Sequence, residues 1–394
     1  MKRSTERFLT THVGSLIRPP EVVELTAAKT SGQAIDDDAL TSTLGVAVAD
    51  VVKRQAQTGI DVISDGEFGK LGWYTYIYDR LEGYERRPAE PPRLGPGGED
   101  RVRFSDYYST MPMPQLQRGN YRQEVCVGPI KYIGQKDMQR DVDNFVSALR
   151  AANHAVEDAF LPVIAPASIS SDHRNEYYKS EEEYLFALAE ALREEYEIIV
   201  NAGLLLQIDD SILANGRDFV IEVLGQDYRK WVELYVEATN HALKGIPEDK
   251  VRYHLCWGSW PGPHTSDGRL DEIIDLVLKI NAQGLSIEAA NPRHEWEWVV
   301  WQDTKLPEGK ILIPGVVSHA ASHVEHPELI AQRLKRFGDL VGAANVIAST
   351  DCGFAQSFRT TRQHPSIQWA KLEALVEGAR LASRQPAMAS SRVR

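Results

Sequence analysis

Short apolar runs recur along the whole chain, and amphipathic stretches separate them. Each run is rich in β-branched or aliphatic residues, and most runs end in a polar or charged residue, as buried parallel strands do. The eight runs are residues 11–16, 61–67, 161–168, 204–209, 251–257, 285–289, 311–318 and 346–352. Apolar positions at helical spacing predict helices over residues 37–58, 180–202, 228–243, 270–282, 327–340 and 367–383. A strand and a helix that alternate in this way predict an α/β fold, the (β/α)8 TIM barrel.

Glycines and one interruption of the repeat refine this prediction. Gly59, Gly203 and Gly284 each stand between a helical stretch and a strand, where left-handed C-terminal caps are expected. Residues 83–124 begin with a stretch rich in Pro and Gly and continue with aromatic residues and methionines. This segment predicts an inserted loop or lid between strands 2 and 3, followed by a short hairpin around residues 125–133. We therefore expect one barrel domain over residues 1–394 with a frayed tail over 384–394.

Charge and hydropathy exclude several classes of partner. With 44 basic and 56 acidic residues the formal charge is −12, and an acidic surface disfavours nucleic acid. Apolar runs fall short of the roughly 20 residues that span a membrane, and residues 1–15 lack the apolar core of a signal peptide. We expect no nucleic-acid or membrane partner and a cytoplasmic location. An apolar stripe on the last predicted helix, at residues 372–379, is compatible with an oligomer as well as with core packing.

Three cysteines are too few for a disulfide framework, which directs attention to metal binding or thiol chemistry. His254 and Cys256 are two residues apart on a predicted strand, so both side chains point to the same side. Glu288 and Cys352 end two further predicted strands, and the functional groups of barrels gather at that face. Zinc is bound by these residue types. The alternative is two small buried cysteines beside a core histidine, and we interpret Cys126 as structural.

Three segments that contain these residues occur in order: YHLCWGS, LSIEAAN and STDCGF. From residue 10 to about residue 382, the chain resembles the catalytic C-terminal domain of the cobalamin-independent methionine synthase family. The resemblance implies that His254, Cys256, Glu288 and Cys352 bind Zn²⁺. It also implies that Asp351, which directly precedes the last cysteine, is a catalytic residue.

Other segments resemble the substrate site of this family. THVGSL implies that Ser15 lies near the substrate carboxylate, while SDGE and LLQIDD imply that Glu67 and Asp209 hold the substrate ammonium. Unpaired acids at a barrel mouth attract a cation, although helix caps or a structural salt bridge would also explain them. In the segment GVVSHAASHVEHP, His319 is the candidate for the catalytic histidine of the family, and His323 is the second choice.

Tryptophans cluster after the two strands that carry the first ligands. We expect Trp257 and Trp260 to line an apolar pocket for the alkyl donor, with Trp257 as a substrate-binding residue. Trp298 and Trp301 are expected to pack between helix and barrel, and packing is also the alternative for the whole cluster.

Two departures from the family concern the methyl donor. Full-length methionine synthases have an additional N-terminal half that helps to bind polyglutamylated folate, and this sequence contains no counterpart. The segment APASISSDHR also lacks the tryptophan that the family stacks on the pterin. These residues do not support folate as the donor, and they leave a corrinoid as a candidate.

The resemblance implies a zinc-dependent alkyltransferase, with methyl transfer to a small homocysteine-like thiol, as in methionine biosynthesis, as the first interpretation. Zinc lowers the pKa of a bound thiol and so generates a nucleophile. One alternative is the addition of a thiol to an epoxide, similar to the epoxyalkane:coenzyme M transferases, with Arg18 and His12 near the sulfonate. The other is a catalytically silent zinc-binding barrel, against which Glu288 counts, because structural zinc is usually bound by Cys and His alone.

Overall fold

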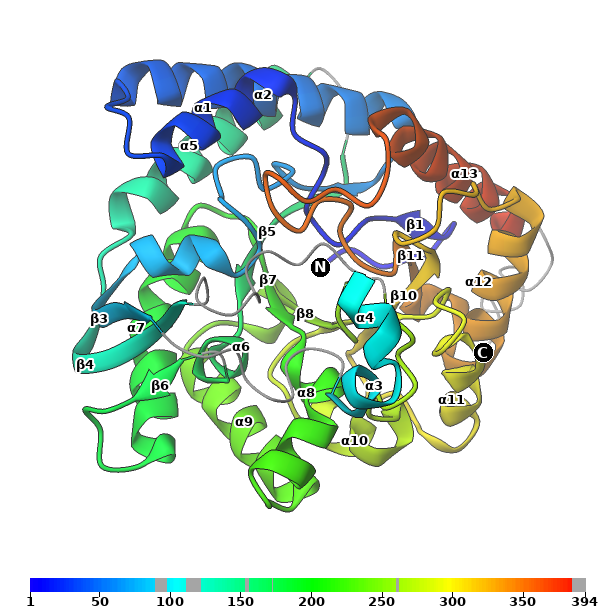
Figure 1. Ribbon diagram of the computed structural model, residues 1–394. Helices are drawn as coiled ribbons and strands as arrows, with labels where there is room; N and C mark the ends of the chain where they lie inside the picture. Colours follow the sequence, from blue (N-terminus) through cyan, green and yellow to red (C-terminus); the bar gives the residue numbers. More distant parts are fainter. Residues whose placement is uncertain (89–97, 111–121, 153–155, 172, 260–261, 385–394) are drawn as a thin grey trace.

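Eight parallel strands form a closed barrel in the computed structural model, which describes residues 1–88, 98–110, 122–152, 156–171, 173–259 and 262–384 (Figure 1). The strands are β1 (Leu9–Thr10), β2 (Val62–Ile63), β5 (Asp158–Ile164), β7 (Leu205–Asp210), β8 (Val251–Leu255), β9 (Gly284–Glu288), β10 (Ile311–Val317) and β11 (Ile347–Thr350). Their order is β1, β11, β10, β9, β8, β7, β5, β2. A parallel bridge between Thr11 and Val62 joins the two ends of this sheet. The predicted TIM barrel is confirmed.

Helices surround the barrel on its outer side (Figure 1). They include α1 (Pro20–Thr30), α2 (Asp37–Thr58), α5 (Gln135–Ala151), α7 (Glu181–Asn201), α9 (Tyr228–Ala242), α10 (Leu270–Val277), α11 (Val300–Asp303), α12 (Pro327–Val341) and α13 (Pro365–Ser383). Helix α2 shows why the sequence forms them. Asp36 caps its first turn, Leu40, Leu44 and Val48 recur on one buried face, and Gly59 ends it with φ 93°.

The structure corrects several predicted boundaries. The predicted strand 161–168 ends at Ile164, because Pro166 begins the short helix α6 (Pro166–Ser170). The first strand covers residues 9–10 instead of 11–16, and α10 ends at Val277 instead of residue 282. Gly203 has the expected positive φ of 86°. Gly284 instead begins β9, where an added Cβ would lie 2.9 Å from Met1 Cε and 3.0 Å from Arg252 Cβ.

The interior of the barrel changes character along its axis. At the amino end of the strands, Leu9, Ile311, Ile313 and Ile347 form an apolar cluster that packs against Met1. Towards the carboxyl ends, the buried side chains become polar, and they include Gln207, Asp209, His254 and Glu288. The apolar end supplies burial energy, and the polar end is the face where barrels place their functional groups.

The insertion between β2 and β5 contains secondary structure of its own. Strands β3 (Leu81–Pro88) and β4 (Arg122–Tyr132) pair antiparallel, and β6 (Arg174–Asn175) adds a parallel strand. Residues 125–133 thus form no hairpin of their own. Their partner strand is β3, which lies at the start of the predicted insertion. Helices α3 (Gly98–Arg103) and α4 (Ser105–Thr110) lie in front of the barrel (Figure 1). Asp100 of α3 accepts the N–H of Thr265, after β8, at 2.7 Å.

Four further sequence predictions concern the C-terminal tail, Trp260, membrane-spanning helices and Cys126. Residues 385–394 of the predicted tail lie outside the described residues, as does Trp260. None of the helices within the described residues is both long and apolar enough to cross a membrane. Cys126 is a buried, unbonded cysteine in β4, in keeping with a structural residue.

A buried ion cluster joins the base of the insertion to two helices of the barrel. Arg80, directly before β3, contacts Glu195 of α7 at 2.6 Å and Asp141 of α5 at 2.9 Å. Tyr76 also donates to Glu195, at 2.9 Å. All four side chains are buried. Removal of one carboxylate would leave the buried Arg80 guanidinium with one of its two carboxylate partners. A buried charge that loses a partner destabilises the fold.

We therefore expect Glu195→Ala to lower the free energy of unfolding by about 3–5 kcal/mol, because it uncouples a buried charge. Urea denaturation followed by circular dichroism measures this change. Glu194→Ala is the matched control, since Glu194 is exposed on the same helix and should cost less than about 1 kcal/mol. Equal losses in the two variants would contradict the role of the cluster.

Candidate functional site

Three predicted ligands meet at the carboxyl ends of the strands. His254 lies in β8, Cys256 directly follows that strand, and Cys352 follows β11. One ligand atom from each residue can be chosen so that all lie within 4.8 Å of one another. The two Sγ atoms are 3.8 Å apart, and both thiols are free. Imidazole and thiol groups in this proximity are the donor set that zinc prefers.

The imidazole of His254 is oriented for metal binding. Nδ1 lies 3.1 Å from the Ser286 hydroxyl on β9, while Nε2 is buried and has no hydrogen-bond partner among the described residues. Burial lowers the pKa of His254 to about 3, so the ring is neutral at physiological pH. In a neutral ring whose Nδ1–H donates to a hydroxyl, Nε2 carries a lone pair, as it does in metal-binding histidines.

Glu288, the fourth predicted ligand, lies beside the other three but is held by protein donors. Its Oε1 accepts the backbone N–H of Trp257 at 2.9 Å and lies 3.5 Å from Cys256 Sγ. Its Oε2 accepts from the side chain of Asn291 at 2.9 Å. Its carboxylate is not part of the cluster of three within 4.8 Å. Metal ligation by Glu288 therefore stays a prediction.

The electrostatics of this cluster favour a bound cation. The hydrogen bond with Cys352, burial and the nearby Glu288 all raise the pKa of the Cys256 thiol. Burial likewise raises the pKa of Glu288. Cys256 and Glu288, packed together, thus resist ionisation in the absence of a positive charge. Together with the free Nε2 of His254, this donor set fits a divalent metal ion, and metal binding would release the thiol protons.

Asp351 ties the end of β11 to the end of β9. Its Oδ1 accepts the backbone N–H groups of Ala289 and Ala290 at 2.8 and 2.9 Å, and the side chain is fully buried. A Cβ at Gly315, on the strand between them, would lie 2.4 Å from the Asp351 Cα, so only glycine fits there. The structure thus supports a positioning role for Asp351 and shows no exposed carboxylate for the catalytic role that the resemblance implied.

Ser15 connects the first β-strand loop to the segment of the last cysteine. Its carbonyl accepts the N–H of Phe354 at 2.9 Å. A Cβ at Gly353 would lie 2.0 Å from the Ser15 hydroxyl, so the two backbones pack in direct contact. Ser15 therefore lies next to the candidate metal residues, which is compatible with the predicted place beside the substrate.

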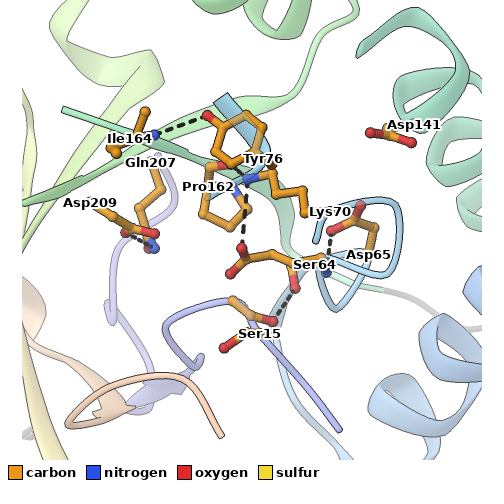
Figure 2. Close-up of polar contacts among 12 residues, drawn as sticks. Ser15, Ser64, Asp65, Lys70, Tyr76, Asp141, Pro162, Ile164, Gln207 and Asp209 are labelled. Carbon is orange, nitrogen blue, oxygen red and sulfur yellow. Dashed lines mark hydrogen bonds and ion pairs between the residues drawn. The ribbon is translucent and has the colours of Figure 1, made fainter. Parts of the chain in front are cut away.

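Glu67 and Asp209, the predicted ammonium ligands, are both buried, and Figure 2 shows Asp209 beside Gln207. Glu67 has φ 60°, a strained value for a residue other than glycine, and Asp65 accepts its N–H at 2.9 Å. Burial and then the charge of Glu67 raise the pKa of Asp209. Gln207 donates to Asp209 at 2.7 Å, and the ammonium of Lys70 lies 3.6 Å from Glu67.

His319 is the better placed of the two candidate histidines. Its side chain is 3% exposed, and neither ring nitrogen has a hydrogen-bond partner within the part of the chain that the structure describes. Burial, with a smaller effect of Arg362, lowers the pKa of His319 to about 3. His323 is exposed, and its carbonyl accepts from Lys371. A catalytic role for His319 stays a prediction.

Trp257 is buried beside the candidate ligands. Its side chain is 0% exposed, the ring stacks on His294 with centroids 4.4 Å apart, and Nε1 donates to the Gly268 carbonyl at 2.7 Å. The indole therefore packs within the protein, and a substrate-binding role for Trp257 stays a prediction. Trp257 acts on the site through its backbone N–H, which binds Glu288. Trp301 is buried, as expected for packing.

The cations considered for a sulfonate are buried and partly bound by the protein, since Nε and Nη1 of Arg18 have no hydrogen-bond partner among the described residues. Arg18 is buried, and its Nη2 donates to the carbonyls of Glu67 and Lys70 at 2.7 and 3.0 Å. His12 is buried, and its Nε2 lies 2.7 Å from the Gln55 side-chain oxygen. These contacts fix the loops around the site.

Sequence reasoning missed three residues that shape the site: Ser286, Asn291 and Lys70. A signal for Ser286 was present, because it precedes Glu288 by two residues on one strand and so faces the same side. Lys70 follows Glu67 by three residues, but nothing in that spacing shows that its amine turns back toward the carboxylate. Asn291 lies in a bend after β9, where side-chain directions follow no period.

Fold and site together define a (β/α)8 barrel with a His/Cys/Cys cluster at its carboxyl-terminal mouth. Residues 165–379 match the family described as cobalamin-independent synthase, catalytic domain, and the chain belongs to this family. The methionine synthase of Sulfurisphaera tokodaii is 26% identical over 375 residues, covering 94% of this chain and 91% of that protein. The uncharacterized protein YxjH of Bacillus subtilis is 24% identical over 386 residues, covering 95% of each chain.

A solved structure shows the same fold. The B12-independent methionine synthase from Shewanella sp. W3-18-1, in complex with selenomethionine, has a TM-score of 0.68 and 19% sequence identity. The match covers 95% of this chain and 97% of that chain.

Measurements of metal affinity can test the link that Asp351 makes between the ends of β9 and β11. We expect Asp351→Ala to weaken zinc binding by about 10–100-fold, because residues that hold metal ligands in place have effects of this size. Competition with a chromophoric chelator measures the affinity. Asp351→Asn is the matched control, since its amide oxygen can still accept both N–H groups. Unchanged zinc affinity in the alanine variant would contradict the role of this residue.

Proposed function

We propose that this protein is a zinc-dependent methyltransferase that transfers a methyl group to a small thiol of the homocysteine type. The observation that carries the proposal is the cluster of His254, Cys256 and Cys352, with ligand atoms within 4.8 Å of one another at the barrel mouth. Membership in the cobalamin-independent synthase family and the relatives named methionine synthase support it.

His254, Cys256 and Cys352 would hold the zinc, with Glu288 as the fourth ligand. Zinc bound there lowers the pKa of a thiol ligand, so that a thiolate is present near neutral pH. Ser286 orients the imidazole of His254 through Nδ1. The Trp257 N–H and the Asn291 side chain donate to Glu288 at 2.9 Å each and would hold its carboxylate in place beside the cysteines.

The other residues of the site orient the substrate. Glu67 and Asp209 bind the ammonium of the thiol, and Ser15 lies toward its carboxylate. A neutral imidazole has one donor and one acceptor nitrogen. His319, buried and without partners among the described residues, can therefore orient the leaving group of the donor by a hydrogen bond. The sequence of the loop after β5 contains no tryptophan for a pterin, so a methylated corrinoid is the donor to test first.

Metal analysis of cysteine variants tests the zinc site. We expect purified wild-type protein to hold one zinc ion per chain, and Cys256→Ser and Cys352→Ser to lose it, because each removes a thiolate ligand. Cys126→Ser is the matched control, since Cys126 is buried in β4 away from the cluster. Full zinc occupancy in both ligand variants would overturn the proposal.

The same preparation separates the alternatives when cobalt replaces zinc. A change of the cobalt absorption spectrum with homocysteine supports the proposed thiol. A change only with 2-sulfanylethanesulfonate would indicate the epoxide reaction, and no change with any thiol would indicate a catalytically silent barrel.

His319 can be tested by turnover with methylcobalamin and homocysteine. We expect His319→Asn to lower kcat by about 10²–10³-fold with unchanged zinc content, because the shorter amide does not reach the place of the imidazole and the loss of one preorganised hydrogen-bond donor has effects of this size. His323→Asn is the control, since that side chain is exposed and should leave kcat unchanged. Wild-type kcat in His319→Asn would exclude the proposed orienting role.

A further inference from the structure

We propose that Lys70 determines substrate specificity: its ammonium keeps the buried carboxylate pair of Glu67 and Asp209 ready for the ammonium of one amino-acid thiol. This inference rests on the proposed function. It concerns a side chain that neither the ligand pattern nor the substrate motifs of the sequence identified.

Lys70 is fixed inside the barrel mouth (Figure 2). Its side chain is 5% exposed, and Nζ donates to the Pro162 carbonyl of β5. The same nitrogen lies 4.4 Å from the centre of the Tyr76 ring, a cation–π arrangement. A buried ammonium is costly without such partners, so these two contacts pin the charge in one place.

The contact between Lys70 and Glu67 supplies charge without a short hydrogen bond. Nζ lies 3.6 Å from Glu67 Oε2, which is beyond hydrogen-bond distance. Oε2 is buried and lacks a hydrogen-bond donor among the residues that the structure describes. On the other side, Gly14 closes the space, because an added Cβ would lie 3.0 Å from Oε1. Glu67 thus retains an unused acceptor, and an ammonium ligand can donate to it.

The backbone around Glu67 is built to hold the carboxylate there. Its strained φ of 60° is supported by Asp65, which accepts the Glu67 N–H at 2.9 Å, and by Arg18, which donates to the Glu67 carbonyl at 2.7 Å. Arg18 also donates to the Lys70 carbonyl at 3.0 Å. Strain that is held by several contacts is characteristic of ligand sites.

Charge balance explains why a lysine belongs here. Glu67 and Asp209 repel each other in a buried environment, whereas Lys70 attracts both carboxylates. Arg252 also attracts Asp209 and Arg18 also attracts Glu67, but the ion pair between Lys70 and Glu67 is the one that the described residues place within 4 Å. Without Lys70, Glu67 would lose this nearest cation, and repulsion from Asp209 would displace it from the binding geometry. The subsite therefore selects a thiol that carries an ammonium.

The test compares two thiols that differ only in the ammonium group. Calorimetry on the zinc-loaded full chain gives Kd for L-homocysteine and for 4-sulfanylbutanoate. We expect Lys70→Gln, whose amide can still donate to Pro162, to weaken L-homocysteine binding by about 10-fold or more, the effect of about 1.4 kcal/mol. Binding of 4-sulfanylbutanoate should change little. Lys70→Arg should restore most of the homocysteine affinity, because the charge returns.

Two further variants keep the result interpretable. Lys70→Met is a second neutral variant, whose flexible chain still packs on Tyr76 if the glutamine destabilises the fold. Lys310→Met is the matched control: Lys310 is also buried and donates to the Ile280 and Ala282 carbonyls at 2.8 Å each, but it precedes β10 at the other end of the barrel. We expect it to leave both Kd values unchanged.

The remaining outcomes would contradict either the role of Lys70 or the proposed function. Equal homocysteine affinity in the neutral variants and wild type would exclude this role of Lys70 and leave the proposed function intact. Tighter binding in the neutral variants would also overturn it, because Lys70 would then occupy the place of the ligand. Wild-type protein that binds neither thiol would overturn the proposed function itself.

Discussion

The carboxylate of Asp351 holds together the part of the barrel that positions the cluster of His254, Cys256 and Cys352. By accepting two N–H groups just beyond β9, it fixes the end of that strand relative to the end of β11, across the intervening β10. Gly315 leaves the space in which Asp351 crosses. Glu288 directly precedes Ala289 and Cys352 directly follows Asp351, so the separation of these two residues is set by this contact. A ligand set on separate strands needs such a link, because parallel pairing alone leaves the strand ends free to diverge.

Strand register explains why so few residues can assemble the site. Asp209 is paired with His254, and His254 with Ser286, on three successive strands. Because side chains alternate along a strand, Ser286 and Glu288 face the same side, as do His254 and Cys256. The apolar cluster around Met1 fills the opposite end of the barrel and supplies burial energy there. The polar end can therefore hold buried carboxylates and a strained backbone at Glu67.

The sequence predicted the features that depend on local periodicity. Helix α2 has the predicted bounds, and His254, Cys256 and Cys352 meet as strand ends in one barrel must. The pairing of β3 with β4 was not predictable, because the partners stand on either side of a long insertion and neither strand indicates the other. The direction of the Trp257 ring could not be predicted for a related reason. Trp257 lies two residues beyond the end of β8, so the alternation of side chains along the strand no longer determines where its ring points.

The site consists of two halves that different strands carry. Strands β8 and β9 and the segments after β8 and β11 carry the candidate metal ligands, whereas β7 and the loop after β2 carry Asp209, Glu67 and Lys70. Ser15 joins the halves, since its carbonyl binds Phe354 and Gly353 packs against its hydroxyl. In the proposed reaction, the distance between the two halves would limit the length of the thiol. Charge at the second half would then select among thiols of suitable length, so that specificity and the chemistry of the sulfur would depend on different residues.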